Sequence, residues 1–389
     1  MPYATGRRFL DADSHLMELP GFLRDHAEAS MRDRLPPIGI SAGGTLGDAL
    51  VGLAEHGGLH PERVDELVAL GDDLIAGPKG YEALGACNAT ERVAALDQLG
   101  FERQFVFSTF AAAAVFRPDE EPDVVRAATA AHNRAMAAFC EADQRMIGVA
   151  VIPLDDPDSA VAEIDHVLEL GLGAVWVPHR LAGGASPGHD RLDRFWAKLA
   201  EAGLPALLHV GGVNLQVEPG WMDTGRPVPN DWLGGGENVR GKDMIALHQP
   251  AELFVGAMVL DGVLERHRDL RLGVIELGAG WVPAMVRRLD QIAAIWQRSE
   301  PELAALVRPP SQQLAEQAGF TPYPFEDVGA MIRESDPNLY LFSSDYPHTE
   351  GGRNPLGRFE ASLAGVDDEV RDLFYAGNMA RLLREPAPV

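Results

Sequence analysis

The chain has 389 residues, of which 46% are apolar and 23% are charged. Lysine and arginine number 33 against 58 acidic residues, a formal net charge of −25. Such a charge excludes a chain built to bind nucleic-acid phosphates or anionic membrane surfaces. Its two cysteines, Cys87 and Cys140, are too few for a disulfide framework, which favours a reducing compartment. With no apolar run of membrane-spanning length and no leader-like start, we expect a soluble cytoplasmic protein acting on small molecules.

Short β-rich runs alternate with longer helix-patterned stretches along the whole chain. Several of these runs are unbroken Val, Ile and Leu, as expected of parallel strands buried on both faces. The fold predicted is an α/β protein, a single (β/α)₈ TIM barrel over residues 1–389, with an open doubly wound sheet as the alternative. The predicted strands are 7–13, 103–109, 146–153, 173–178, 205–210, 272–277 and 339–345, and a weaker run at 316–322 could supply the eighth.

The segments between the strands read as helices. Residues 89–100 start near Thr90, a plausible N-cap, and stop at Gly100. Residues 122–144 form a long alanine-rich helix. Residues 158–171 and 189–203 each end in glycine before the next strand, the pattern of a right-handed crossover.

Two long stretches interrupt this alternation. Residues 31–88 lie between the first and second predicted strands, and residues 211–248 follow the fifth. Both would leave the carboxyl ends of strands, where barrel active sites are built. We expect these insertions to act as lids or walls of a site.

The first predicted strand ends in three ionisable residues. Asp11, Asp13 and His15 stand at i, i+2 and i+4, so their side chains share one face of a strand. Burying them without a partner would be unfavourable, and a divalent cation would satisfy them together. A pair of this kind taken alone is also compatible with a surface turn.

Three other strand ends carry similar residues. His209 ends the fifth strand, Glu276 ends the sixth, and Asp345 ends the last, with His348 just beyond it. A single strand-end histidine is commonly only a core residue, but these ends would all meet at one mouth of a barrel. Imidazole with carboxylate suits Zn²⁺, Mn²⁺ or Fe²⁺, and it differs from the all-oxygen cage of Ca²⁺.

Several motifs give the chain a family resemblance. They are DADSH (11–15), ERVAALDQLG (91–100), LPALLHVGG (204–212), VLERHRDLRLGVIELGAGWVP (263–283) and FSSDYPHTEG (342–351). Over about residues 8 to 383, the chain resembles the amidohydrolase-related family of metal-dependent hydrolases. This family includes aminocarboxymuconate semialdehyde decarboxylase and the resorcylate- and carboxyvanillate-type decarboxylases.

The resemblance implies a metal centre with assigned ligands. The metal roles fall on Asp13 and His15, on His209, and on Asp345, with one divalent ion, zinc as first expectation and manganese or iron as alternatives. Asp13 replaces the more familiar His or Glu. Glu276 stands where many family decarboxylases have a histidine acting as base, so their mechanism does not transfer directly. The family also implies a homodimer.

Three hypotheses about the function follow. The first is a hydrolase in which metal-activated water attacks a carbonyl-type bond, with Glu276 as general base and Asp345 moving a proton. The alternative is a non-oxidative decarboxylase of an aromatic or unsaturated carboxylic acid. That chemistry calls for a cation to hold the carboxylate, and Arg180 and Arg240 are the candidates. The third is a non-catalytic barrel.

Three more residues are candidates for binding a substrate. His179 follows the fourth strand, His248 precedes the sixth, and Trp281 follows Glu276. Histidines in such places pack in the protein interior as often as they bind a substrate. Tryptophan is more commonly a core-packing residue than a binding residue. These loops contain no motif that identifies the substrate.

Overall fold

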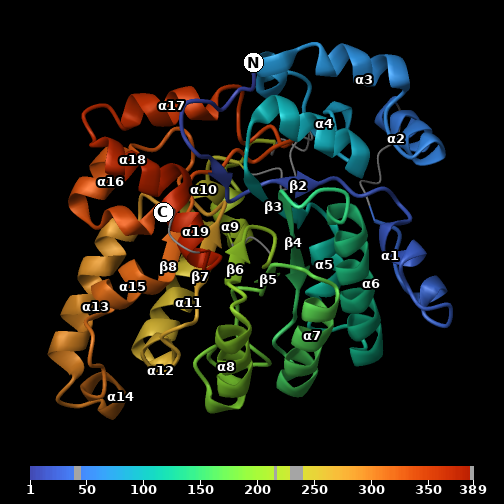
Figure 1. Ribbon diagram of the computed structural model, residues 1–389. Helices are drawn as coiled ribbons and strands as arrows, with labels where there is room; N and C mark the ends of the chain where they lie inside the picture. The colour runs from blue at the N-terminus through green and yellow to red at the C-terminus, as the bar shows by residue number, and fades with distance from the viewer. Residues whose placement is uncertain (39–44, 214–216, 228–239, 386–389) are drawn as a thin grey trace.

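A parallel sheet curled into a barrel forms the centre of the protein in this computed structural model (Figure 1). The structure describes residues 1–38, 45–213, 217–227 and 240–385. All strand pairs are parallel, in the order β1-β3-β4-β5-β6-β7-β8, with β2 also pairing with β3. The predicted α/β barrel is therefore confirmed. The strands are β1 (Leu10–Asp11), β2 (His15–Leu16), β3 (Arg103–Ser108), β4 (Met146–Val151), β5 (Ala174–Trp176), β6 (Ala206–His209), β7 (Leu272–Ile275) and β8 (Ala318–Phe320).

The barrel closes through residues 340–346, which run between β8 and the first strands. Tyr340 pairs with Phe320 and Tyr346 with Ser14 in isolated parallel bridges. The predicted strand at 339–345 is therefore wrong as a regular strand, although its place in the barrel is right. Its irregularity has a local cause, because the Ser344 amide donates to the Asp11 side chain instead of to a backbone carbonyl (2.7 Å). The weaker run at 316–322 does contain a strand, β8.

Helices wrap the outside of the strands, as Figure 1 shows for α6, α7, α8 and α11. The longer ones, of seven residues or more, are α2 (Thr45–His56), α3 (Pro61–Val68), α4 (Ala89–Leu99), α6 (Pro122–Cys140), α7 (Pro157–Glu169), α8 (Asp193–Ala202), α11 (Gln249–Leu260), α13 (Val282–Trp296), α15 (Pro310–Gln317), α16 (Val328–Glu334) and α17 (Pro355–Ser362). The shorter ones are α1 (Phe22–Asp25), α5 (Ala111–Val115), α9 (Pro219–Met222), α10 (Asp243–Ala246), α12 (Val263–Arg266), α14 (Pro301–Ala304), α18 (Asp368–Asp372) and α19 (Asn378–Leu382). Single turns of tighter or wider helix are η1 (Arg32–Arg34), η2 (Gly71–Ala76), η3 (Gly80–Glu82), η4 (Asp190–Leu192), η5 (Pro337–Leu339) and η6 (Leu373–Gly377).

The helix ends follow the capping rules with one correction. Gly100 ends α4 and Gly203 ends α8, both with the left-handed backbone that glycine adopts without a Cβ clash (φ 78° and 71°). The N-cap of α4 is Asn88, not Thr90, because the Asn88 side chain accepts a hydrogen bond from the Glu91 amide. Asn at an N-cap stabilises a helix at least as well as Thr.

Alternate residues of the strands face two different apolar regions. In β3, Phe105 and Phe107 pack in the cluster inside the barrel, whereas Val106 packs in the cluster under the helices. In β6, Leu207 points inward and Leu208 outward in the same way. The strands are thus buried on both faces, which explains their unbroken apolar sequences.

The first insertion, residues 31–88, is attached to the barrel mouth by tyrosine hydroxyls. Tyr81 donates to the carbonyl oxygen of Glu18, just after β2 (2.7 Å), and Tyr346 donates to that of Leu84 (2.7 Å). The helices α2 and α3 of this insertion lie beyond α4 at one end of the barrel (Figure 1). Of the second insertion, residues 211–248, the parts 214–216 and 228–239 lie outside the described residues.

In the described part of the chain, no helix is both long enough and apolar enough to cross a membrane.

The opposite end of the barrel is fastened by Arg381 on α19. Its guanidinium donates to the carbonyl oxygens of Glu316 (2.8 Å), Ala318 (2.9 Å) and Asn338 (2.6 Å). These carbonyls stand at the start of β8 and of the closing segment. One charged side chain therefore links β8 to the neighbouring closing segment of the barrel.

Replacing Arg381 by Met should lower the free energy of unfolding by about 2–4 kcal/mol, because three carbonyls lose a charged donor. Urea unfolding followed by circular dichroism would measure the change in midpoint. Arg358→Met, at an exposed position of α17, is the matched control and should change the stability by about 0.5 kcal/mol or less. Equal midpoints for the two variants would show that the Arg381 contacts do not stabilise the barrel.

Candidate metal centre

Six buried side chains with ligand-type atoms meet at the carboxyl ends of the strands. They form two overlapping groups in which the ligand atoms lie within 4.8 Å of one another. The first group is Asp13, His15, His209 and Glu276, and the second is His15, Glu276, Asp345 and His348. The structure thus brings together every residue predicted from the sequence to bind the metal, together with Glu276.

The shortest approaches join imidazole nitrogens to carboxylate oxygens. His209 Nε2 lies 3.2 Å from Asp13 Oδ1 and 3.4 Å from Glu276 Oε2. His15 Nε2 lies 3.3 Å from Asp13 Oδ1, 3.8 Å from Glu276 Oε2 and 3.5 Å from Asp345 Oδ1. The two imidazole nitrogens therefore face the same small space from different strands.

Two of the carboxylates stand on backbone with an unusual conformation. Glu276 and Asp345 have φ of 54° and 53°, in the left-handed region that residues other than glycine rarely adopt. Glu276 is held there by its own main chain, because its amide donates to Thr321 Oγ1 (2.8 Å) and its carbonyl accepts from the Tyr323 hydroxyl (2.9 Å). Backbone strain of this kind concentrates at functional sites, where it aims a side chain.

Hydrogen bonds outside the cluster orient its histidines. His209 Nδ1 contacts the Val210 carbonyl (2.8 Å), which can only accept, so this nitrogen carries the hydrogen. Thr109 donates its hydroxyl to the Leu16 carbonyl and therefore accepts from His348 Nε2 (3.0 Å). His348 Nδ1 is then left with its lone pair toward Asp345 Oδ1, 3.3 Å away. Such partners commonly fix the tautomer of a metal-binding histidine.

Burial and neighbouring charges shift the pKa values of the cluster in opposite directions. Burial lowers the pKa of His15 well below its usual range and that of His348 to about 4, so both imidazoles are neutral near pH 7. Burial, followed by the charge of Asp13, raises the pKa of Asp345 well above its usual range. Burial opposes ionisation of Asp13 as well, but His209 and His15 hold its pKa below the usual range.

These residues fit a divalent metal ion. Both carboxylate oxygens of Asp345, both ring nitrogens of His15 and His348 Nδ1 are buried and make no hydrogen bond within the described residues. In His348 and Asp345, a lone pair and a carboxylate face each other, an arrangement that is unfavourable until a cation lies between them. Neutral imidazole and carboxylate are the ligands of Zn²⁺, Mn²⁺ and Fe²⁺ sites.

Asp11 does not belong to the cluster, although the alternation of the strand placed it on the same face as Asp13. Its carboxylate accepts from the Ser344 amide (2.7 Å), the Ser344 hydroxyl (2.6 Å) and Gln104 Nε2 (2.7 Å). Burial raises its pKa to about 7 despite these bonds. Asp11 thus joins the first strand to the closing segment instead of facing a cation.

The residues predicted to bind substrate lie outside the two metal groups. His179 is buried, and its burial, followed by the charge of His209, lowers its pKa to about 3. His248 stacks on the ring of Trp281, with centroids 5.5 Å apart, and Trp281 donates its ring N–H to the Gly278 carbonyl (2.9 Å). Their role toward a substrate stays a prediction.

Sequence reasoning noted His348 but did not count it as a ligand, and it overlooked Arg92. Asp345 and His348 are three residues apart in a turn, a spacing that could have suggested a shared site. Arg92 is fully buried and donates to the carbonyl of His15, to that of Gly85 (2.8 Å) and to Gln104 Oε1 (3.3 Å). It lay inside the ERVAALDQLG motif, which could be read only as a helix.

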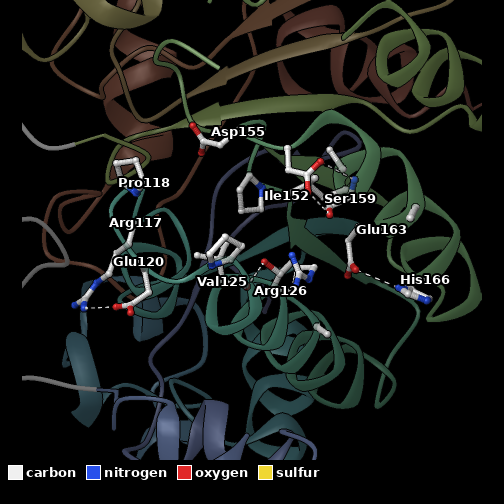
Figure 2. A pocket seen from close by; sticks show the side chains of 17 residues that line it. Arg117, Pro118, Glu120, Val125, Arg126, Ile152, Asp155, Ser159, Glu163 and His166 are labelled. Carbon is white, nitrogen blue, oxygen red and sulfur yellow. Dashed lines mark hydrogen bonds and ion pairs between the residues drawn. The ribbon is translucent and has the colours of Figure 1, made fainter. Parts of the chain in front are cut away.

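The small space at the metal cluster and a larger hollow lie in different parts of the structure. A space of about 10 Å³ lies beside Asp13, Glu276 and Asp345, walled by Tyr323 and Glu350. A larger hollow, of about 430 Å³, lies on the outside of the barrel between α6 and α7, and Figure 2 shows the side chains that line it. Prolines, alanines and several charged side chains line it, and no residue of the metal cluster does. We therefore place the chemistry at the strand ends.

Comparison with known proteins gives the class. A family model described as Amidohydrolase matches residues 81–384, so the chain belongs to this amidohydrolase family, as its motifs predicted. Decarboxylase orsB of Emericella nidulans is 27% identical over 238 residues, which are 60% of this chain and 68% of that protein. The chain is accordingly an enzyme, either a hydrolase or a carboxy-lyase of this family.

Solved structures share the barrel over nearly their full length. The amidohydrolase map2389c from Mycobacterium avium subsp. paratuberculosis K-10 aligns with a TM-score of 0.73 and 23% identity, covering 98% of this chain and 100% of that one. A 5-carboxyvanillate decarboxylase from Novosphingobium aromaticivorans, complexed with manganese and a nitrobenzoic acid, aligns with a TM-score of 0.64 and 15% identity, covering 98% and 99%. At these identities the likeness establishes the fold.

Replacing His209 by Ala should abolish tight binding of Mn²⁺ and Zn²⁺, because it removes one imidazole from a buried ligand group. Losses of about tenfold to a hundredfold follow even from changes outside the ligand shell, so a lost ligand should cost more. Metal content after dialysis, measured by mass spectrometry, gives the answer. His166→Ala, at an exposed position of α7, is the control and should keep its metal. A His209 variant that retains a full equivalent would disprove the assignment.

Proposed function

We propose that this protein is a metal-dependent, non-oxidative decarboxylase of a small aromatic or unsaturated carboxylic acid. The observation that carries the proposal is Asp345. Its carboxyl group is buried at the end of the closing segment, both oxygens lack hydrogen bonds within the described residues, and it faces His15 and His348. A carboxyl group so placed can hold a proton and deliver it. The similarity to decarboxylase orsB supports the same function.

The metal would be held by Asp13, His15 and His209, with Glu276 and Asp345 at the remaining sides of the cluster. When bound, a divalent cation would polarise the carboxylate and a neighbouring oxygen of the substrate. We expect manganese or zinc there, and the manganese in the carboxyvanillate decarboxylase favours the former.

The chain's own groups would then move one proton. Asp345, carrying a proton on one oxygen, donates it to the ring carbon that bears the carboxylate. The electrons of the breaking carbon–carbon bond stay with that carbon until the proton arrives, and carbon dioxide leaves. Burial, which raises the pKa of Asp345, favours the protonated carboxyl group needed for this step.

Glu276 was the basis of the hydrolytic hypothesis from the sequence, and its position now favours the alternative. Its Oε2 lies 3.4 Å from His209 Nε2 and 3.8 Å from His15 Nε2, inside both groups of ligand atoms. This position supports a role for Glu276 as a metal ligand, rather than as a base that stands apart from the metal. Hydrolysis stays the second candidate, because Glu276 is the carboxylate that could take a proton from water.

Incubating the manganese-loaded protein with a panel of hydroxybenzoic acids should release carbon dioxide from at least one of them, measured by gas chromatography. Replacing Asp345 by Asn should lower kcat by about a hundredfold or more, the usual contribution of a general acid. Arg358→Met serves again as the control. No release from any acid, with turnover of amides or lactones instead, would refute the proposal.

The isosteric change Glu276→Gln separates the two candidate reactions. If Glu276 is a metal ligand in a decarboxylase, the neutral amide would weaken metal binding, and added Mn²⁺ should restore most of the activity. If Glu276 is the base of a hydrolase, an amide could not take the proton, and activity should fall by about a hundredfold or more at saturating metal. Rate measurements across a metal titration distinguish these outcomes.

A further inference from the structure

The first insertion places an ammonium group beside the metal centre. Lys79 directly precedes η3, and its Nζ is buried without a hydrogen bond in the described part of the chain. The charge of Lys79 interacts with that of Asp345 and acts on His348, while no ion pair joins Lys79 to a carboxylate among the described residues. A buried lysine without a partner is unfavourable, so such a group calls for an anion.

The backbone around Lys79 is tied to the segment that carries Asp345. The amide of Gly80 donates to the carbonyl of Pro347 (2.9 Å), and the Tyr346 hydroxyl donates to the carbonyl of Leu84 (2.7 Å). Lys79 Nζ lies over the ring of Tyr346, 5.4 Å from its centroid. The ammonium is therefore held in place by its surroundings rather than carried on a loose side chain.

Two arginines near the strand ends, Arg180 and Arg92, are engaged elsewhere. Arg180 donates twice to Asp155, at 2.8 and 2.7 Å. Arg92 donates its hydrogen bonds to the backbone carbonyls of Gly85 and His15 and to the side chain of Gln104. The candidacy of Arg180 from the sequence thus finds no support in its contacts. For Arg240, the backbone amide donates to Asp243 (2.8 Å), and this bond leaves the role of its guanidinium a prediction.

Asp345 is the carboxylate whose charge interacts with that of Lys79, but a divalent metal would bind this carboxylate. With the cation bound, Asp345 either shares its negative charge with that cation or carries the proton that it is proposed to deliver. In both states the ammonium needs a different counterion. A substrate entering the same mouth is the remaining source of negative oxygen. A charged hydrogen bond to such an oxygen is among the stronger ones in proteins.

We propose that Lys79 is a substrate-binding residue whose ammonium holds a negatively charged oxygen of the substrate beside Asp345. This inference rests on the proposed function and specifies its substrate class: an acid that presents an oxyanion to Lys79 while its reacting carbon faces Asp345. It assigns to the insertion 31–88 a direct part in choosing the substrate.

The test compares an anionic with a neutral ring in the manganese-loaded protein. Salicylate is the anionic probe and phenol the neutral one, both measured by calorimetry. Lys79→Met keeps the length of the side chain and removes its charge. It should weaken salicylate binding about tenfold or more and change phenol binding less than about threefold. Lys79→Arg should recover part of the salicylate affinity. Lys198→Met, on the outer helix α8, should match the wild type.

Three results would overturn the inference. They are equal salicylate affinity in Lys79→Met and wild type, equal losses for salicylate and phenol, and a loss of bound manganese in Lys79→Met. Wild-type protein that binds no salicylate at millimolar concentration would overturn it as well. If the protein releases carbon dioxide but its affinity for salicylate does not depend on Lys79, only this inference is refuted. If salicylate binding depends on Lys79 but no acid releases carbon dioxide, only the decarboxylase function is refuted.

Discussion

The burial of three carboxylates among three imidazoles is the constraint on which the rest of this structure depends. Asp13, Glu276 and Asp345 lie at the mouth of the barrel with little exposure to water. Carboxylates in such a place are strongly disfavoured unless positive charge accompanies them. His15 and His348 do not supply it near pH 7, since burial keeps them neutral. A cation bound among these ligands would supply the missing positive charge, and its binding would then add to the stability of the folded state.

Barrel closure depends on the same strand ends. The closing segment must present Asp345 to the cluster while it still pairs with the first strand. Asp11 meets both needs, because its carboxylate takes the Ser344 amide that a regular ladder would have paired with a carbonyl. The ladder is lost locally, and the positive φ of Asp345 becomes possible at the next residue. The departure from regular strand geometry at 339–345 is thus a condition for the site.

Much of the fold and most of the site could be predicted from the sequence, and the exceptions have physical reasons. Strands buried on both faces can be recognised by their unbroken apolar runs, and the carboxyl ends of parallel strands lie at one mouth of a barrel. Asp13, His15, His209 and Asp345 could therefore be grouped from the sequence. Lys79 could not be placed, because nothing local ties an insertion of this length to a particular strand end. Asp11 was misjudged because the alternation of the strand breaks between β1 and β2. Four residue steps lead from Asp11 to His15, whereas only three separate their partners Gln104 and Phe107 on β3. The homodimer, the cytoplasmic location and the single-domain description stay predictions.

Charge balance also gives a reason for Glu276, at the position where the family resemblance implied a histidine in many decarboxylases. With Asp13, Glu276 and Asp345 ionised, a divalent cation and the Lys79 ammonium would bring the centre to neutrality. If Asp345 instead holds the proton that it is proposed to deliver, the centre carries one positive charge, which a substrate with one negative charge would cancel. Histidine in place of Glu276 would add one further positive charge and suit a more negative ligand. On this argument Glu276 would set the charge of the acid that the site accepts, and Lys79 would decide where that acid lies.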